Sequence, residues 1–77
     1  MAATSDEWAG RVKRYLKAEL KRADVSYAEL AAKLTGMGLP ETEGSITVKV
    51  NRGSFPAWFF FATMKALNRD VVRVEDI

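Results

Sequence analysis

The stretch Ser26–Leu34, SYAELAAKL, carries the clearest folding signal in the chain. Ser26 is a favourable N-cap, and Glu29 three positions later completes the pattern of a capping box. Apolar residues then recur at helical spacing, and two glycines and Pro40 follow, which end a helix. The stretch therefore predicts a helix, with Met37 as a further candidate for its buried side, which is formed by Ala28, Leu30, Ala31 and Leu34.

A longer helix is predicted before this stretch, from about Asp6 to Ala23. Ser5 is the expected N-cap, and the two acidic residues after it suit the positive end of the helix dipole. Residues 1–5 are expected to be a flexible N-terminus. Apolar residues at steps of three or four form one stripe, with Tyr15 beside it, made of Trp8, Val12, Leu16, Leu20 and Ala23.

The same predicted helix is strongly basic. Residues 11–22 hold six basic side chains against Glu19 alone, a net charge of +5, although the whole chain carries only +2. Stacked like charges repel each other by a few tenths of a kcal/mol per pair. The face is either a solvated surface or a surface for phosphates or another polyanion, and its cations are Arg11, Lys13, Arg14, Lys17, Lys21 and Arg22.

The segment 43–52 is ambiguous. Residues 45–50 alternate polar and apolar and are rich in β-branched side chains, which is typical of a strand. Against this, Thr42 is a plausible N-cap, Ile46 and Val50 are four apart on one helical face, and Gly53 suits the position after a helix. The local signals favour neither structure.

A further helix is predicted over Phe55–Leu67, with Ser54 as cap and Pro56 at or near the first helical position. This segment is apolar almost all round, so it is either central in the fold or covered by a partner. Its expected core residues are Phe59, Phe60, Met64 and Leu67, while Trp58, Phe61 and Lys65 form another face. The tail 71–77 fits either a strand or the opening turn of a last helix.

Length and composition narrow the classes of function. Seventy-seven residues make a single domain, and the most apolar segment, Phe55–Ala62, is too short to cross a bilayer, so we expect a cytoplasmic protein with no membrane role. The chain has no cysteine and no histidine, which removes the usual general base, thiol nucleophile and metal ligands. We therefore expect that the protein is not an enzyme and that it binds no metal ion or cofactor. The serines are interpreted as caps or surface hydroxyls. The carboxylates are interpreted as charges at the start of a helix (Glu41, Glu43) or as surface or tail charges (Asp70, Glu75, Asp76).

Two segments carry a resemblance to known families. Ser26–Leu34 resembles the first helix of a helix-turn-helix in the lambda-repressor-like class. Residues 49–60, KVNRGSFPAWFF, are more specific: they resemble a small family of uncharacterised bacterial proteins that pairs an ELAxxL helix with K-x-x-R-G-x-F-x-A-x-F-F. The resemblance covers residues 26–67. It implies an all-α fold, a small four- to five-helix bundle containing a helix-turn-helix, with residues 1–77 as one domain.

The resemblance also implies a function. Residues 43–52 would be the recognition helix of a small transcriptional or nucleoid-associated regulator that binds double-stranded DNA, although the turn before them is longer than in a typical repressor. Its outward residues are poor base readers, so phosphate contacts would dominate. Ser45, Thr47 and Val48 are the candidates for base edges, and the candidates for phosphates are Lys33, Lys49, Asn51, Arg52, Arg11, Arg14 and Lys17.

Two expectations concern protein partners. One such domain buries little DNA, so a homodimer is expected, with Trp58 and Phe61 as candidates for the contact. The alternative function is a protein-protein interaction module that keeps a repressor-like fold without a DNA role, because a fold does not fix a function.

Overall fold

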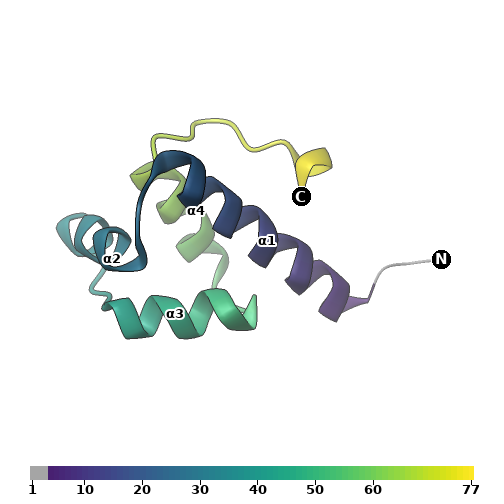
Figure 1. The fold of residues 1–77 in the computed structure, drawn as a ribbon, viewed down its shortest axis with the longest axis horizontal. Coiled ribbons are helices and arrows are strands. Elements are labelled where there is room, and N and C mark those ends of the chain that lie inside the picture. Colours follow the sequence, from purple (N-terminus) through teal and green to yellow (C-terminus); the bar gives the residue numbers. More distant parts are fainter. Residues whose placement is uncertain (1–3) are drawn as a thin grey trace.

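The chain folds into helices alone over the part that the structure describes. The computed structural model describes residues 4–77, in which α1 (Ser5–Ala23), α2 (Tyr27–Gly36), α3 (Glu43–Arg52) and α4 (Ala57–Ala66) precede a short 3-10 helix, η1 (Val74–Asp76). No strand occurs among these residues. The prediction of a small all-α bundle is therefore confirmed, with α2 and α3 as its packed helix-turn-helix pair (Figure 1).

Caps determine where the first two helices begin. Ser26 Oγ accepts from the N–H of Glu29, and the Glu29 carboxylate accepts from the N–H of Ser26, both at 3.1 Å, which confirms the capping box. In α1 the N-cap is Thr4, one residue before the predicted cap, because the Thr4 hydroxyl accepts from the N–H of Glu7. The helix α1 therefore begins within the segment expected to be a flexible N-terminus, and residues 1–3 of that segment lie outside the described residues.

The ambiguous segment 43–52 is a helix. Thr42 and Ser45 form a second capping box, and Ile46 and Val50 are both fully buried on one side. A strand would have placed Val48 on the same face as these two residues, whereas Val48 is 49% exposed. The strand alternative is wrong. The helix satisfies its first backbone N–H groups through the capping box, and it also buries the β-branched side chains of Ile46 and Val50 on one side.

The helix α4 is shorter than predicted at both ends. Pro56 is its N-cap rather than its first helical residue, and no side chain caps it, so the expected cap by Ser54 is wrong. Phe55 lies outside the helix and packs on Phe59, with 5.1 Å between the ring centroids. At the other end, Leu67 takes the C-cap position and remains buried.

One hydrophobic core joins the four helices. Its buried apolar residues are Leu16, Leu20, Leu30, Ala31, Leu34, Ile46, Val50, Phe59, Met64 and Leu67. Phe60 and Tyr15 are half-buried at its edge. Three residues expected on buried sides are exposed: Trp8, Ala28 and Met37. Ala28 is exposed because it lies two positions before the buried Leu30, which is a rotation of about 200° around the helix axis. Burying one large apolar side chain contributes about 1.5–3 kcal/mol, so a domain of this size depends on most of these residues.

The helix α3 ends directly against α1. Gly53 has φ of 64°, and a Cβ added there would lie 2.5 Å from the carbonyl oxygen of Ala9. Glycine is therefore required at this position both by the backbone conformation and by the close approach of α1. The junction fixes the position of α3 relative to α1.

The segment after α4 runs back along α1, so that the C-terminal residues lie beside the first half of that helix (Figure 1). The tail contains the single 3-10 turn Val74–Asp76, so it is neither a strand nor an α-helix. Over residues 4–77, no helix is both long and apolar enough to traverse a bilayer.

Candidate nucleic-acid interface

The outward side of α3 is small and nearly uncharged. Gly44, Val48 and Asn51 are exposed along it, with Arg52 at its C-terminal end. Thr47 is half-buried, and its hydroxyl donates to the carbonyl of Glu43 at 2.8 Å within the same helix. Six of the predicted contact residues therefore lie on one helix, although only some of their side chains face outward.

Two of those candidates, Ser45 and Lys49, are bound by the side chain of Glu41. The Glu41 side chain is only 3% exposed; its Oε1 accepts from Ser45 Oγ at 2.6 Å, and its Oε2 pairs with Lys49 Nζ at 2.5 Å. Burial raises the pKa of Glu41, but the hydrogen bonds from Lys49 and Ser45 outweigh it and lower that pKa overall. Ser45 and Lys49 therefore stabilise the turn before α3, and their polar atoms are engaged within the protein rather than free to contact a nucleic acid.

Lys49 also reaches the aromatic residues of α4. Its Nζ lies 5.1 Å from the ring centroid of Phe59 and 6.0 Å from that of Trp58, within the range of cation–π attraction. The ammonium is thus surrounded by a carboxylate and two rings. This cluster ties the turn, α3 and α4 together.

Sequence reasoning missed the role of Glu41. It was interpreted as a charge at the start of a helix, which is correct for the exposed Glu43, but Glu41 precedes the N-cap and is buried. The spacing of Glu41, Ser45 and Lys49, at i, i+4 and i+8, was an available signal because it places three polar residues in one row.

The outer side of α1 carries the exposed cations. Arg14, Lys17 and Lys21 are exposed, and none of them has a hydrogen-bond or ion-pair partner within residues 4–77. We call these three residues the basic face. Lys13 lies at the edge of the basic face. Its Nζ donates to the carbonyl of Asn51 at 3.1 Å and so caps the C-terminal end of α3. The basic face therefore belongs to the helix that anchors α3.

The basic face continues to the start of α2. Lys17 and Lys21 line an open groove of about 540 Å³ together with Ser26, Tyr27 and Glu29. A helix N-terminus favours anions because its first N–H groups lack partners within the helix. The groove also contains Asp24, so its two lysines are balanced partly by nearby carboxylates. Lys33 is exposed further along α2.

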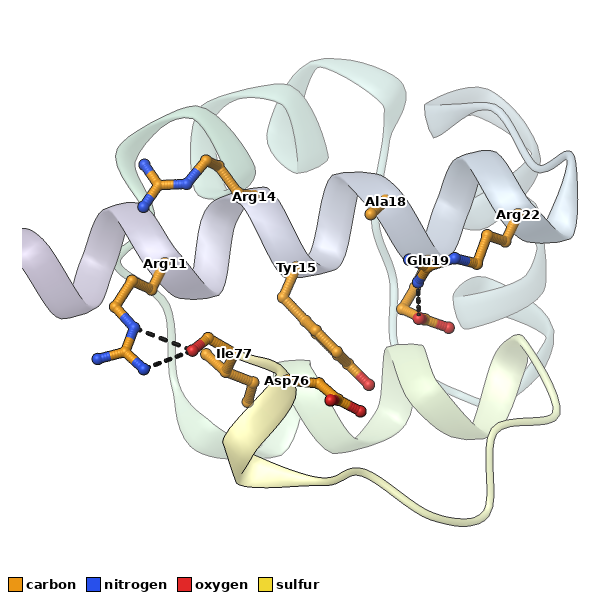
Figure 2. Close-up of a pocket in the computed structure, with 8 residues that line it drawn as sticks. All are labelled: Arg11, Arg14, Tyr15, Ala18, Glu19, Arg22, Asp76 and Ile77. Atoms are coloured by element: carbon orange, nitrogen blue, oxygen red, sulfur yellow. Dashed lines mark hydrogen bonds and ion pairs between the residues drawn. The ribbon is translucent and has the colours of Figure 1, made fainter.

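The opposite edge of α1 is covered by the C-terminal residues. Arg11 donates from Nε and Nη2 to the main-chain oxygen of Ile77, at 2.9 and 2.6 Å, and its guanidinium stacks 4.1 Å from the ring centroid of Trp8. Figure 2 shows this contact, with the Arg14 guanidinium pointing away from Ile77. Arg11 was predicted to contact phosphate, but its donors are directed to the protein's own tail.

The pocket beside this contact, of about 680 Å³, mixes both charges. Arg22 pairs with the buried carboxylate of Glu19, and Arg69 reaches the same carboxylate at 2.9 Å. Burial, followed by the charges of Glu19 and Asp76, raises the pKa of Tyr15. The prediction that Asp76 is only a surface charge is incomplete, since it lines this pocket. Within residues 4–77, no three His, Cys, Asp or Glu side chains are arranged to hold a metal ion.

Comparison with known proteins places the chain in a family. Residues 8–72 match the family described as a domain of unknown function, DUF6471, and because the match spans most of the chain, the chain belongs to that family. No curated protein and no solved structure matches the chain. The family therefore supplies no activity.

Proposed function

We propose that the chain is a DNA-binding domain with a lambda-repressor-like helix-turn-helix, which acts in the cytoplasm as a small transcriptional or nucleoid-associated regulator. The observation that carries the proposal is the basic face: Arg14, Lys17 and Lys21 are exposed and unpaired within residues 4–77, on the helix that packs against α3. Cations that the fold leaves unneutralised are available to phosphates.

The exposed side of α3 suits close contact more than base reading. Gly44 and Val48 are small enough to allow the helix backbone to approach a groove, and Val48 offers an apolar contact to a thymine methyl group. Glu43 in the first turn repels phosphate, so the affinity comes from other residues. On this proposal the phosphate-binding residues are Arg14, Lys17, Lys21, Lys33 and Arg52, with Asn51 beside them.

Salt dependence tests the proposal directly. Neutralising five phosphates predicts a slope of about −4.5 in a plot of log K against log salt concentration, or about a 500-fold loss of affinity from 50 to 200 mM salt. Fluorescence anisotropy with a labelled 20-base-pair duplex measures this slope. Absence of binding at low salt, or an affinity that does not change with salt, contradicts the proposal.

Variants locate the contacts. The double variant Lys17→Gln and Lys21→Gln should reduce the salt slope by about two and weaken binding to all duplex sequences equally. Arg73→Gln is the matched control, because Arg73 is exposed, pairs with Glu75 and lies outside the proposed contact set. If the control weakens binding as much as the double variant does, the basic face is not the binding surface.

A second candidate function is a protein-protein interaction module. Its support is the exposure of two large aromatic residues, Trp58 and Phe61, on α4. This candidate predicts that the domain fails to bind DNA at low salt while a Phe61 variant loses a protein contact. The anisotropy titration therefore separates the two candidates.

A further inference from the structure

The outer side of α4 is an exposed aromatic surface. Trp58 is 50% exposed and Phe61 is 64% exposed, although the opposite side of the same helix buries Phe59, Thr63 and Met64. Exposed aromatic residues three positions apart form a continuous patch on a helix. Patches of this kind are enriched at the centres of protein interfaces.

One cation completes this surface. Lys65 is exposed four residues after Phe61 and is the single charged residue of α4. Trp58, Phe61 and Lys65 thus lie in one row, with a ring at one end, a ring in the centre and an ammonium group at the other end. We call these three residues the α4 row.

We propose that the α4 row binds a second copy of this chain, with the two α4 helices antiparallel and related by a two-fold axis at Phe61. Along the helix axis, Lys65 lies about 6 Å from Phe61 in one direction, and Trp58 lies about 4.5 Å from Phe61 in the other. In an antiparallel pair, Lys65 of the second copy is therefore within about 1.5 Å of the level of Trp58.

This arrangement makes the row complementary to itself. The ammonium of each copy lies over the indole of the other, where it gains cation–π attraction, and the two Phe61 rings pack at the centre. A parallel arrangement would instead bring the two ammonium groups together. In the antiparallel pair the two Lys65 residues are about 12 Å apart along the axis, which is beyond the Debye length of about 8 Å at physiological salt.

The helix ends also favour the antiparallel pair. Each α4 carries the positive end of its dipole at Ala57 and the negative end near Ala66, so antiparallel neighbours place opposite ends together. Ala57, one turn before Phe61, is exposed and small, which allows the second helix to approach closely. These features identify a second copy as the occupant of the surface.

Sedimentation velocity of the full chain without DNA tests the proposal. The wild-type protein should change from monomer to dimer with increasing concentration, and Phe61→Glu should raise the dimer dissociation constant by roughly 30-fold or more, as expected for a central interface residue. Met37→Glu is the matched control, since Met37 is an exposed apolar residue at the C-cap of α2 and should leave the dimer unchanged. Circular dichroism checks that both variants keep their helices.

A second variant tests the orientation of the helices. Lys65→Glu places a carboxylate over the indole and should weaken the dimer several-fold, and in a Trp8→Phe background the emission of Trp58 should shift as the dimer forms. A wild-type protein that stays monomeric up to about 1 mM overturns the proposal, as does a dimer that Phe61→Glu leaves intact. A dimer insensitive to Lys65→Glu overturns the antiparallel geometry. None of these measurements depends on DNA binding.

Discussion

The helices α1 and α3 pack against each other but use their charged residues in opposite ways. Around α3, the charges of Glu41 and Lys49 neutralise each other inside the fold, and Ser45 is bound to the same carboxylate. On α1, by contrast, Arg14, Lys17 and Lys21 remain exposed. Most of the exposed positive charge of the two helices therefore belongs to α1, with Arg52 alone exposed at the end of α3. Under the proposed function, this distribution favours affinity over sequence reading.

The largest effect is expected where these two helices meet. Gly53→Ala should lower the free energy of unfolding by about 2–4 kcal/mol, because alanine is disfavoured at positive φ and its Cβ would overlap the Ala9 carbonyl. Urea denaturation followed by circular dichroism measures the change. The matched control is Gly36→Ala in α2, where an added Cβ meets nothing within 4 Å; this variant should gain about 0.5–1 kcal/mol. If the two variants unfold with equal free energies, the close contact between Gly53 of α3 and Ala9 of α1 is not present in solution.

The next effect concerns the neutralised charges of α3. Glu41→Gln should lower the free energy of unfolding by about 1–3 kcal/mol, because it leaves the ammonium of Lys49 without its anion. Glu43→Gln, two positions later and exposed, should change it by only about 0.3–1 kcal/mol through the helix dipole. Thermal unfolding of the two variants gives the comparison. If Glu43→Gln lowers the free energy of unfolding more than Glu41→Gln does, the pairing of Glu41 with Lys49 is not the main electrostatic stabilisation of this region.

Acid should weaken the same cluster. Because its hydrogen bonds lower the pKa of Glu41 in the folded state, the stabilisation is complete above the ordinary value of 4.5 and is lost as the pH falls through the folded pKa. The backbone and side-chain hydrogen bonds from Ser26 lower the pKa of Glu29 in the same direction. Unfolding measured from pH 7 to pH 2 should show this loss, and Glu41→Gln should make the profile shallower. If the pH profile of that variant equals the wild-type profile, the protonation of Glu41 does not cause the loss of stability in acid.

The smallest effect is expected at the covered edge of α1. Arg11→Gln removes two hydrogen bonds to Ile77, which should reduce the stability by about 0.5–1.5 kcal/mol and change the NMR chemical shifts of residues 74–77. Arg14→Gln, on the same helix but without a bonding partner within residues 4–77, should leave those shifts in place. Similar shifts in both variants would indicate that the tail is not held by Arg11.

Local sequence signals predicted the helices whose determinants are local. The capping box of Ser26 and Glu29 needs only residues three positions apart, so α2 was predicted with its correct cap. Residues 45–50 fit two periods equally well, and the choice between them depended on the burial of Ile46 and Val50 against other helices. The start of α4 was predicted too early because a proline pattern marks a helix start only to within a residue or two.

The candidate site was harder to predict because its properties depend on distant contacts. The bond from Arg11 to Ile77 joins residues 66 positions apart, and no local pattern indicates it. For the same reason, Lys49 reads as an exposed cation in the sequence, whereas the fold places it between a buried carboxylate and the rings of α4. Helical periodicity predicted that Trp58, Phe61 and Lys65 share a face apart from the expected core residues, but it left open whether that face is buried, and the fold exposes all three.

The turn at Val74–Asp76 has an electrostatic consequence. It holds the carboxylate of Asp76 against the Arg11 edge of α1, while Lys17 and Lys21 stand on the edge nearest α2. The Asp76 carboxylate therefore partly offsets the charge of the arginines on that flank of the helix. Because dissolved salt screens such charges, the Asp76 carboxylate lowers the positive potential of that flank most strongly at low ionic strength.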